Sequence, residues 1–322
     1  MRDTRRREFI VATAMLLAAV ISASARGTSK PYRVGFLTVA PDESFQQSLR
    51  ELGYVEGRDL ILEMRDIEGR YELLEKMALD LVQLNVNVIV ASFPAAVLSA
   101  KRATTTIPIV MVNTPDPVQL GLVASLARPG GNITGLSTLT LDVSIKQLEL
   151  LRETVPRLSR VALLWNRDNP WHTIAIKDVH ARSASLGTQL QLFEASSPDS
   201  FEHAFRAMTA ERAQAVLILA DPLLFAHRQR LSELALMHRL PAMGNVLGYA
   251  ESGSLMSYWA DRSELARRAA SYVDRILNGA KPAELPIEQP TKFEFVINLK
   301  TAKKLGITVP QPVLLRADRL IE

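Results

Sequence analysis

A set of polar and aromatic residues follows the strands that the hydrophobic pattern of this chain predicts. Open parallel sheets bind their ligands beyond the carboxyl ends of the strands. The residues placed directly after each predicted strand therefore form the candidate ligand-binding set. They are Thr38, Ser92, Phe93, Asn113, Thr114, Asp116, Trp165, Asn166, Asp221, Asn245, Tyr258 and Trp259.

The chemistry of this set suits a small polar solute. Ser92 stands just before a predicted helix, so its hydroxyl and the free N–H groups of the first helical turn could hold a carboxylate. Asp116 and Asp221 could bind an ammonium group or sugar hydroxyls. Aromatic walls could come from Phe93, Trp165, Tyr258 and Trp259.

A second interpretation of the same residues is structural. Asp, Ser, Asn and Pro are common in turns and at helix N-termini whether or not a ligand binds there. This interpretation explains each residue taken singly. The whole set, repeated after strand upon strand, favours a binding cleft.

Motifs for catalysis, nucleotide binding and metal binding are absent from the sequence. It has no G-x-G-x-x-G after a strand, no G-x-x-x-x-G-K-[ST] and no G-x-S-x-G. Its five histidines match no helical metal pair, and the lack of cysteine excludes disulfides and thiolate zinc sites. We therefore predict no catalytic residue, no metal ligand and no cofactor.

The elements that position the candidate residues alternate between strands and helices. Strands are predicted over residues 33–39, 60–64, 86–91, 107–112 and 133–137. Helical periods lie between them, as in the apolar spacing of Phe45, Leu49 and Leu52. The segment Asn113–Pro117 contains two prolines and is not expected to continue the strand before it.

The same rhythm restarts after residue 160. Strands are predicted over residues 161–165, 190–194, 215–220, 241–245 and 254–258, and a long amphipathic helix runs from Leu265 to Ile276. Alternating strands and helices indicate parallel sheets covered by helices on both faces. The fold class is therefore α/β, and the two runs, 33–138 and 160–258, predict two lobes of similar build.

The N-terminus has the three parts of a secretory signal peptide. Arg5–Arg7 is basic, residues 10–21 are apolar or small, and Ala23–Ala25 offers the small residues that signal peptidase accepts. The apolar run is shorter than the roughly 20 residues that span a bilayer. We expect residues 1–25 to be removed and the mature chain to be periplasmic. Arg6-Arg7-x-Phe9 fits a twin-arginine signal as well as an ordinary one.

Charge and composition exclude other classes of protein. The full chain carries a formal charge of +4, and the four arginines of residues 1–25 exceed their two acidic residues, so the mature part is less basic still. A net charge this small does not indicate the basic surface with which proteins bind nucleic acid. Without cysteine no lipid anchor can follow the signal, and no later segment is long and apolar enough to span a membrane.

Several long stretches resemble one family of transport proteins. They are LRELGYVEGRDL (49–60), TTIPIVMVNTPDPVQLGLVASLARPGGNITGLS (105–137), HRLPA (238–242), SGSLMSY (252–258) and the block 275–322. These stretches resemble the periplasmic substrate-binding proteins of ABC transporters, in the family that includes tryptophan- and tyrosine-type binding proteins. The resemblance extends from Tyr32 to Glu322.

The resemblance implies a type I periplasmic-binding-protein fold, in which two doubly wound parallel-sheet lobes are joined by three crossovers. It places the N-terminal lobe at 31–138 plus 261–288 and the C-terminal lobe at 139–258 plus 293–322. Crossovers are expected near 137–140, 258–261 and 288–293. The implied partners are a small-molecule ligand and the permease of an ABC transporter.

Two positions depart from the family pattern. Trp259 stands where the family usually has glycine after Ser-Tyr, and Ser92-Phe93-Pro94 stands where relatives often carry Gly-Thr-Pro. An indole at residue 259 could line the cleft, stack on the ligand or cover the hinge. The ligand of a relative therefore cannot be transferred directly.

Three hypotheses follow from the sequence. The first is a periplasmic receptor that captures a small solute, such as an amino acid or an aromatic compound, for an ABC importer. The second is an exported two-lobed enzyme using Asp116 or Asp221 as acid or base, which lacks a nucleophile–base pair. The third is the sensing core of a repressor, which would need a helix-turn-helix where the signal peptide stands.

Overall fold

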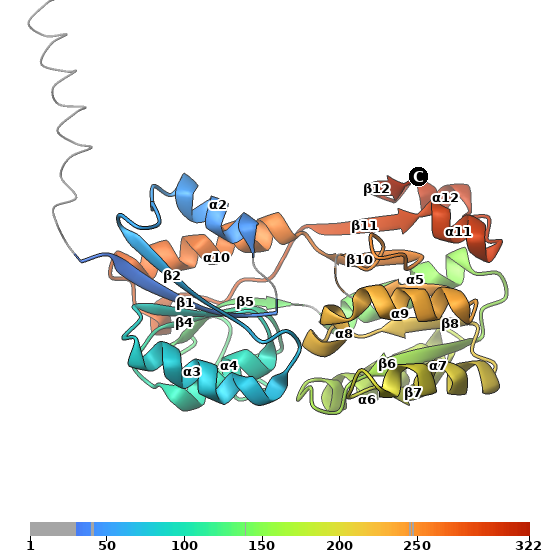
Figure 1. Ribbon diagram of the computed structural model, residues 1–322, viewed down its shortest axis with the longest axis horizontal. Helices are drawn as coiled ribbons and strands as arrows, with labels where there is room; N and C mark the ends of the chain where they lie inside the picture. Colours follow the sequence, from blue (N-terminus) through green and yellow to red (C-terminus); the bar gives the residue numbers. More distant parts are fainter. Residues whose placement is uncertain (1–29, 40–41, 139, 245, 247) are drawn as a thin grey trace, which may run out of the picture.

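The computed structural model contains two α/β lobes that lie end to end along the long axis of the molecule (Figure 1). It describes residues 30–39, 42–138, 140–244, 246 and 248–322. The predicted signal peptide, residues 1–25, lies outside these ranges. No helix within them is long and apolar enough to cross a membrane.

The first lobe is built on a parallel sheet with strand order β2-β1-β3-β4-β5. Its strands are β1 (Tyr32–Thr38), β2 (Leu60–Asp66), β3 (Val88–Ala91), β4 (Ile109–Pro115) and β5 (Ile133–Thr138). Its helices are α2 (Glu43–Glu51), α3 (Leu74–Gln83), α4 (Pro94–Ala103) and α10 (Arg262–Leu277), with the short 3-10 turns η1 (Tyr71–Leu73) and η2 (Pro282–Glu284).

Apolar residues cover both faces of the first sheet because both faces carry helices. α2 and α10 pack on one face, and α3 and α4 pack on the other (Figure 1). The alternation of β1 divides its residues between the two cores, with Phe36 facing α10 and Leu37 facing α3. α2 begins at Asp42, whose side chain accepts hydrogen bonds from the N–H groups of Ser44 and Phe45.

The second lobe repeats this strand order and extends it. Its sheet has the order β12-β11-β10-β9-β8-β6-β7. The strands are β6 (Arg160–Trp165), β7 (Gln189–Glu194), β8 (Ala215–Ile218), β9 (Ala242–Gly244), β10 (Met256–Ala260), β11 (Phe293–Asn298) and β12 (Arg319–Ile321). The helices are α5 (Thr140–Thr154), α6 (His172–Ser185), α7 (Ser200–Ala210), α8 (Pro222–Ala226), α9 (Arg228–Met237), α11 (Leu299–Leu305) and α12 (Gln311–Leu314).

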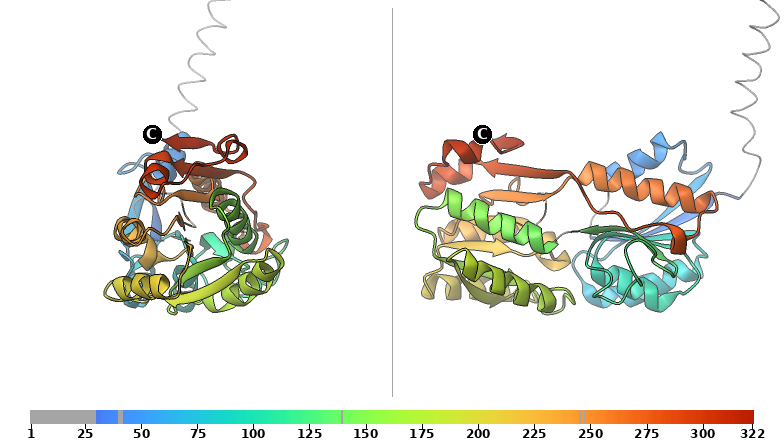
Figure 2. Two further views of the ribbon diagram at one scale, coloured as in Figure 1. Left: turned by 90° about the vertical axis from the view of Figure 1, so that its right-hand side faces the viewer. Right: turned by 180° about the vertical axis from the view of Figure 1, so that it is seen from behind.

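Helices cover both faces of the second sheet as well (Figure 2). α5, α6, α11 and α12 share one core with the sheet, and α7, α8 and α9 share the other. Along the residues that the structure describes, the chain passes between the lobes three times: after β5, at Asp261 between β10 and α10, and between η2 and β11. The predicted fold class, two parallel-sheet lobes with three crossovers, is confirmed.

Two details of the sheets differ from the sequence prediction. β4 continues through Asn113 to Pro115, although the two prolines of Asn113–Pro117 predicted that the strand would end before Asn113. The strand survives because a register shift between Met111 and Thr114 admits a bulge, with Asn113 at φ +53°. In the second sheet β11 runs antiparallel to β10, so that sheet is not purely parallel.

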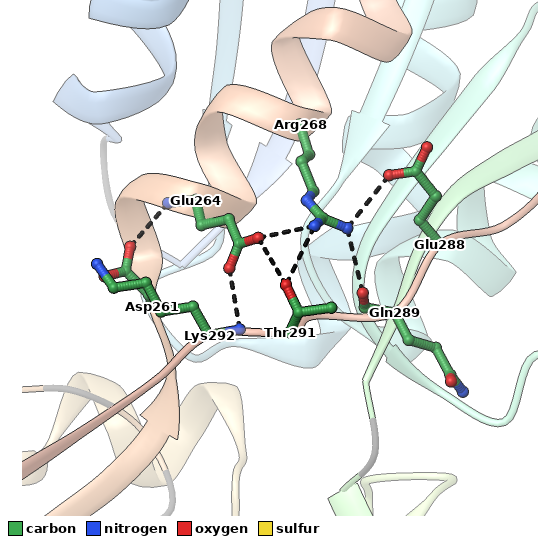
Figure 3. Close-up of polar contacts among 7 residues, drawn as sticks. All are labelled: Asp261, Glu264, Arg268, Glu288, Gln289, Thr291 and Lys292. Atoms are coloured by element: carbon green, nitrogen blue, oxygen red, sulfur yellow. Dashed lines mark hydrogen bonds and ion pairs between the residues drawn. The ribbon is translucent and has the colours of Figure 1, made fainter.

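A buried carboxylate fixes the third crossover to the start of α10 (Figure 3). Glu264 accepts a hydrogen bond from the backbone N–H of Lys292 at 3.1 Å and one from the Thr291 hydroxyl at 3.2 Å, and it pairs with Arg268 at 2.8 Å. Arg268 reaches on to Glu288 at 3.3 Å. Two of the three interlobe segments are thereby held together through one helix.

Candidate functional site

A cavity of about 160 Å³ lies between the lobes, at the carboxyl ends of the strands. Its first-lobe wall comes from the ends of β1, β3 and β4 and the start of α10, and its second-lobe wall comes from the turn after β6 and the start of α8. An apolar cavity of about 150 Å³ is large enough to hold benzene. The space therefore suits a solute with a single ring or a branched chain.

The structure brings half of the predicted set together around this cavity. Those that line it are Thr38, Ser92, Phe93, Asn113, Asp221 and Trp259. Ser92 donates its hydroxyl to the carbonyl oxygen of Leu37 at 3.1 Å, so its oxygen keeps its capacity as an acceptor.

Other members of the set lie away from the cavity wall. Thr114 is completely buried, and its hydroxyl points back to the carbonyl of Val112. Asp116 is exposed and accepts a hydrogen bond from the N–H of Gln119, which makes it a turn residue here. The neighbours Val112 and Asn113 both line the cavity because the bulge in β4 interrupts the alternation of side chains, and Thr114 faces away from it.

In the second lobe, neighbouring side chains of β10 face opposite ways. Trp259 faces the cavity, whereas Tyr258 stacks on Phe293 with ring centroids 5.5 Å apart. Trp165 packs beside the core of the second lobe, and Asn166 is buried beneath the cavity, where its amide lies against Asp221. Asn245 lies outside the described residues.

Several lining residues were not in the predicted set. They include Asn169, Trp171, Phe225 and Val246 from the second lobe and Asp42 and Arg262 from the first. Asn169 and Trp171 belong to the turn that begins at Asn166, three to five residues beyond the point where the prediction stopped. Asp42 and Arg262 sit at the starts of α2 and α10 and form an ion pair at 3.6 Å. The helix-start signal could have identified both.

Asp221 is the centre of a hydrogen-bond network that spans the lobes. Its Oδ1 accepts from the N–H of Leu224 at 3.0 Å, which caps α8. Its Oδ2 accepts from the hydroxyl of Tyr71 at 2.7 Å and from the amide of Asn169 at 3.1 Å. The amide of Asn166 lies 3.3 Å from both oxygens. Neutral donors thus stabilise a buried negative charge, and one of them comes from the opposite lobe.

His172 contacts the backbone of two residues at this network, Asn166 and Ala220. Its Nδ1 lies 3.0 Å from the backbone N of Asn166, and its Nε2 lies 3.1 Å from the carbonyl oxygen of Ala220. These contacts suit a neutral ring protonated at Nε2. Burial lowers the pKa of His172, against an opposing pull from Asp221 and the two backbone groups. The neutral ring therefore links the backbone of Asn166 to that of Ala220, the residue before Asp221.

Gly69 and Tyr71 bring the first lobe into direct contact with α8 of the second. A Cβ atom at Gly69 would lie 2.9 Å from the Cα of Leu223. The ring of Tyr71 packs edge-on against Phe93, with centroids 6.4 Å apart, while its hydroxyl reaches Asp221. Burial and the neighbouring carboxylate raise the pKa of the Tyr71 phenol well above its usual value, so it keeps the proton that it donates.

Unpartnered polar atoms belong to three of the lining side chains. The Oδ1 of Asn113 is a buried acceptor without a hydrogen bond, and the indole Nε1 atoms of Trp171 and Trp259 are buried donors without one. The two tryptophans are only 6% and 5% exposed. Buried polar groups in folded proteins are nearly always paired. All three atoms belong to residues that line one cavity, which indicates that a bound polar solute supplies their hydrogen-bond partners.

Helix starts provide a second polar feature. The N-cap residues of α2, α8 and α10 are Asp42, Asp221 and Asp261, and each of these carboxylates accepts at least one hydrogen bond from an N–H group of its own helix. α4 has Phe93 as its N-cap residue, so no side chain accepts hydrogen bonds from its first N–H groups, and its first turn contains no acidic residue. Because Ser92 and Phe93 line the cavity, this helix presents uncapped N–H groups beside a place where an anion could bind.

Catalytic constellations do not occur around the cavity. Its described lining contains neither histidine nor lysine, and the Ser92 hydroxyl donates to a backbone carbonyl instead of to a base. No cluster of three or more histidine, aspartate or glutamate side chains elsewhere in the described ranges could hold a metal ion. The described lining therefore offers no pair of a nucleophile and a base.

Comparisons with known proteins agree with this geometry. A family model described as ABC transporter substrate binding protein matches residues 39–321. A curated relative, the Tyrosine-binding protein of Clostridioides difficile strain R20291, is 24% identical over 266 residues, which cover 82% of this chain and 76% of the relative.

Solved structures show the same fold. A conserved domain protein from Vibrio cholerae is 27% identical, with a TM-score of 0.84 over 90% of this chain and 100% of that chain. An ABC domain in complex with L-Trp from Streptococcus pneumonia is 24% identical, with a TM-score of 0.83 over 91% of this chain and 100% of that chain. Both match the two-lobed arrangement along nearly the whole length of this chain.

Proposed function

The chain belongs to the family of ABC transporter substrate-binding proteins, and from this premise we propose that it is the extracytoplasmic solute receptor of an ABC importer. The ligand is an amino acid or a closely related zwitterion, captured between the lobes. The observation that carries the proposal is the interlobe cavity with its buried, unpartnered Asn113, Trp171 and Trp259 atoms.

Opposite ends of a zwitterion find different partners in this cavity. The carboxylate takes the uncapped N–H groups at the start of α4 together with Ser92. The ammonium group takes the unpartnered Oδ1 of Asn113 and the negative field of Asp221. The names of the relatives support this assignment, since one is a Tyrosine-binding protein and another was solved with L-Trp.

Ligand binding is coupled to closure of the lobes. A ligand shifts an open–closed equilibrium only through contacts that differ between the two states. Here the cavity wall is divided between the lobes, which we propose to comprise residues 31–138 plus 261–288 and residues 139–258 plus 293–322. A solute touching both walls therefore stabilises the closed form, which is the form offered to the permease.

The test is a thermal-shift screen of the purified mature chain against L-amino acids, their N-acetyl and amide derivatives, sugars and divalent metal ions. Stabilisation follows RT ln(1 + [L]/Kd), about 2.7 kcal/mol at a hundredfold excess over Kd. We expect free amino acids to stabilise the protein and both blocked derivatives to do so far less. Stabilisation by sugars or metal ions alone would refute the proposal.

Export is the second part of the proposal. Residues 1–25 act as a signal peptide, by the general or the twin-arginine route, and the mature chain starts near Arg26 in the periplasm. N-terminal sequencing of protein recovered from the periplasm tests this. An intact Met1 on cytoplasmic protein would contradict it.

A further inference from the structure

The interlobe cavity continues into the interior of the first lobe. Phe36 and Val112 line it, and each lies upstream of the polar end of its strand, two residues before Thr38 on β1 and one before Asn113 on β4. Both belong to the core between the first sheet and α10. The cavity thus has a polar end at the strand termini and an apolar end under a helix.

Small residues of α10 leave room at the apolar end. Ala266 and Ala269 are three positions apart, so they lie on the same face of the helix. Both line the cavity, next to Leu265, and both are almost completely buried. Each leucine placed at such a position would extend three further carbon atoms toward the sheet.

We infer that the space between α10 and the first sheet is the subsite for the ligand's side chain, and that Ala266 and Ala269 set the size of the side chain it accepts. The inference rests on the proposed function. This subsite would accept an amino acid whose side chain is apolar and has the size of a single ring or a branched aliphatic chain. Charged side chains are excluded because Phe36, Val112 and Leu265 offer a charge no partner, and an unpaired charge is costly to bury.

The experiment compares L-phenylalanine, L-leucine, L-alanine and L-lysine on the wild type and on Ala269→Leu, by calorimetry or competition binding. We expect the wild type to bind L-phenylalanine at least tenfold more tightly than L-alanine or L-lysine. In Ala269→Leu the affinity for L-phenylalanine should fall at least tenfold, while that for L-alanine stays within threefold. Arg267→Leu, an exposed position on the same helix, is the matched control and should leave the ratio unchanged.

Folding of the variant is checked by its melting temperature. If the space beside Ala269 is open, the added leucine fills it and the melting temperature of the ligand-free protein stays equal or rises. Should Ala269→Leu fail to fold, Ala266→Gly provides the opposite change. It enlarges the subsite and should improve binding of L-tryptophan relative to L-phenylalanine.

The outcomes separate the subsite from the function. A wild type that binds amino acids, with a variant that keeps the wild-type ratio of L-phenylalanine to L-alanine affinity, overturns the subsite alone. An equal loss of both ligands also overturns it, because a size limit acts on the larger ligand. A wild type stabilised by no amino acid overturns both the proposed function and the subsite.

Discussion

Replacing Gly69 by alanine should weaken ligand binding although residue 69 lies outside the cavity. The alanine Cβ would lie 2.9 Å from the Cα of Leu223, 3.3 Å from the carbonyl oxygen of Pro222 and 3.2 Å from the Cβ of Ala226. Ordinary van der Waals contact begins near 3.4 Å. Backbone atoms of α8 cannot rotate away, so the two lobes must separate by a few tenths of an ångström or more at this point.

The separation should break a neighbouring hydrogen bond between the lobes and so lower the affinity for the ligand. Tyr71 donates to Asp221 at 2.7 Å, two residues from the clash. A hydrogen bond to a charged group contributes about 1.5–3 kcal/mol, and the lower value applies because Tyr71 is only half-buried. If ligand binds tightly only to the closed form, losing about 1.5 kcal/mol of closure raises the apparent Kd roughly tenfold.

Gly57→Ala is the matched control, because it reproduces the backbone strain without the clash. Gly57 has φ +81° and Gly69 has φ +80°, but nothing lies within 4 Å of a Cβ at Gly57. Alanine in this left-handed region costs about 1–2 kcal/mol at either site. Both variants should therefore lose similar stability in urea unfolding, and only Gly69→Ala should bind ligand more weakly in calorimetry. Equal ligand affinity in the two variants would refute the closure reasoning.

Further predictions concern the contacts around the cavity and the hinge. Tyr71→Phe should raise the dissociation rate of the ligand about tenfold by removing the interlobe hydrogen bond, measured by stopped-flow fluorescence; an unchanged rate would contradict this. Glu264→Gln should cost about 2 kcal/mol in urea unfolding because its buried carboxylate accepts two hydrogen bonds and pairs with Arg268, whereas the exposed Glu284→Gln should cost little; equal costs would count against the crossover network. Because burial lowers the pKa of His172, its neutral state stabilises the fold at high pH, and this contribution is lost as pH falls below the ordinary value of about 6.5. Urea unfolding between pH 5 and 7.5 should show a steeper loss in the wild type than in His172→Gln, and parallel curves would show the reasoning to be wrong.

Much of the fold could be predicted from the sequence because local signals and topology agree. Apolar runs such as Val161–Trp165 are buried on both sides in a parallel sheet, and they read as continuous hydrophobic strands. Helix starts carry their own signals, as at Asp42. The direction of β11 could not be predicted in the same way, because an antiparallel strand differs from a parallel one in its pairing and not in its composition.

The candidate site could be predicted in outline for a simple reason. Strand ends in parallel sheets meet at one edge, so Ser92 and Asp221 were placed near a common cavity by topology alone. The bulge in β4 could not be predicted, and it decides that Asn113 faces the cavity while Asp116 turns to solvent. Trp171 lies beyond the strand end in a turn, and its position depends on a hydrogen bond from its own N–H to the side chain of Asn169.

Contacts between the lobes leave almost no local signal in the sequence. Gly69 and Tyr71 follow a strand end, but α8 approaches them from 150 residues away. A glycine at φ +80° can be explained locally as a turn residue. Its second requirement, a missing Cβ atom, comes from Leu223 of the other lobe, whose Cα would lie 2.9 Å from that atom.

Asp221 has several roles at once, and for this reason the binding proposals are tested by substitutions at Gly69 and Ala269 instead. The same carboxylate caps α8, accepts a hydrogen bond from the hydroxyl of Tyr71 across the cleft and supplies negative charge to the cavity. Asp221→Asn would disturb all three at once, and a loss of binding would not identify its cause. Gly69→Ala changes closure and leaves the charge in place, whereas Ala269→Leu changes the apolar end and leaves closure in place. Because the two sites share no contact, their effects on the free energy of binding should add.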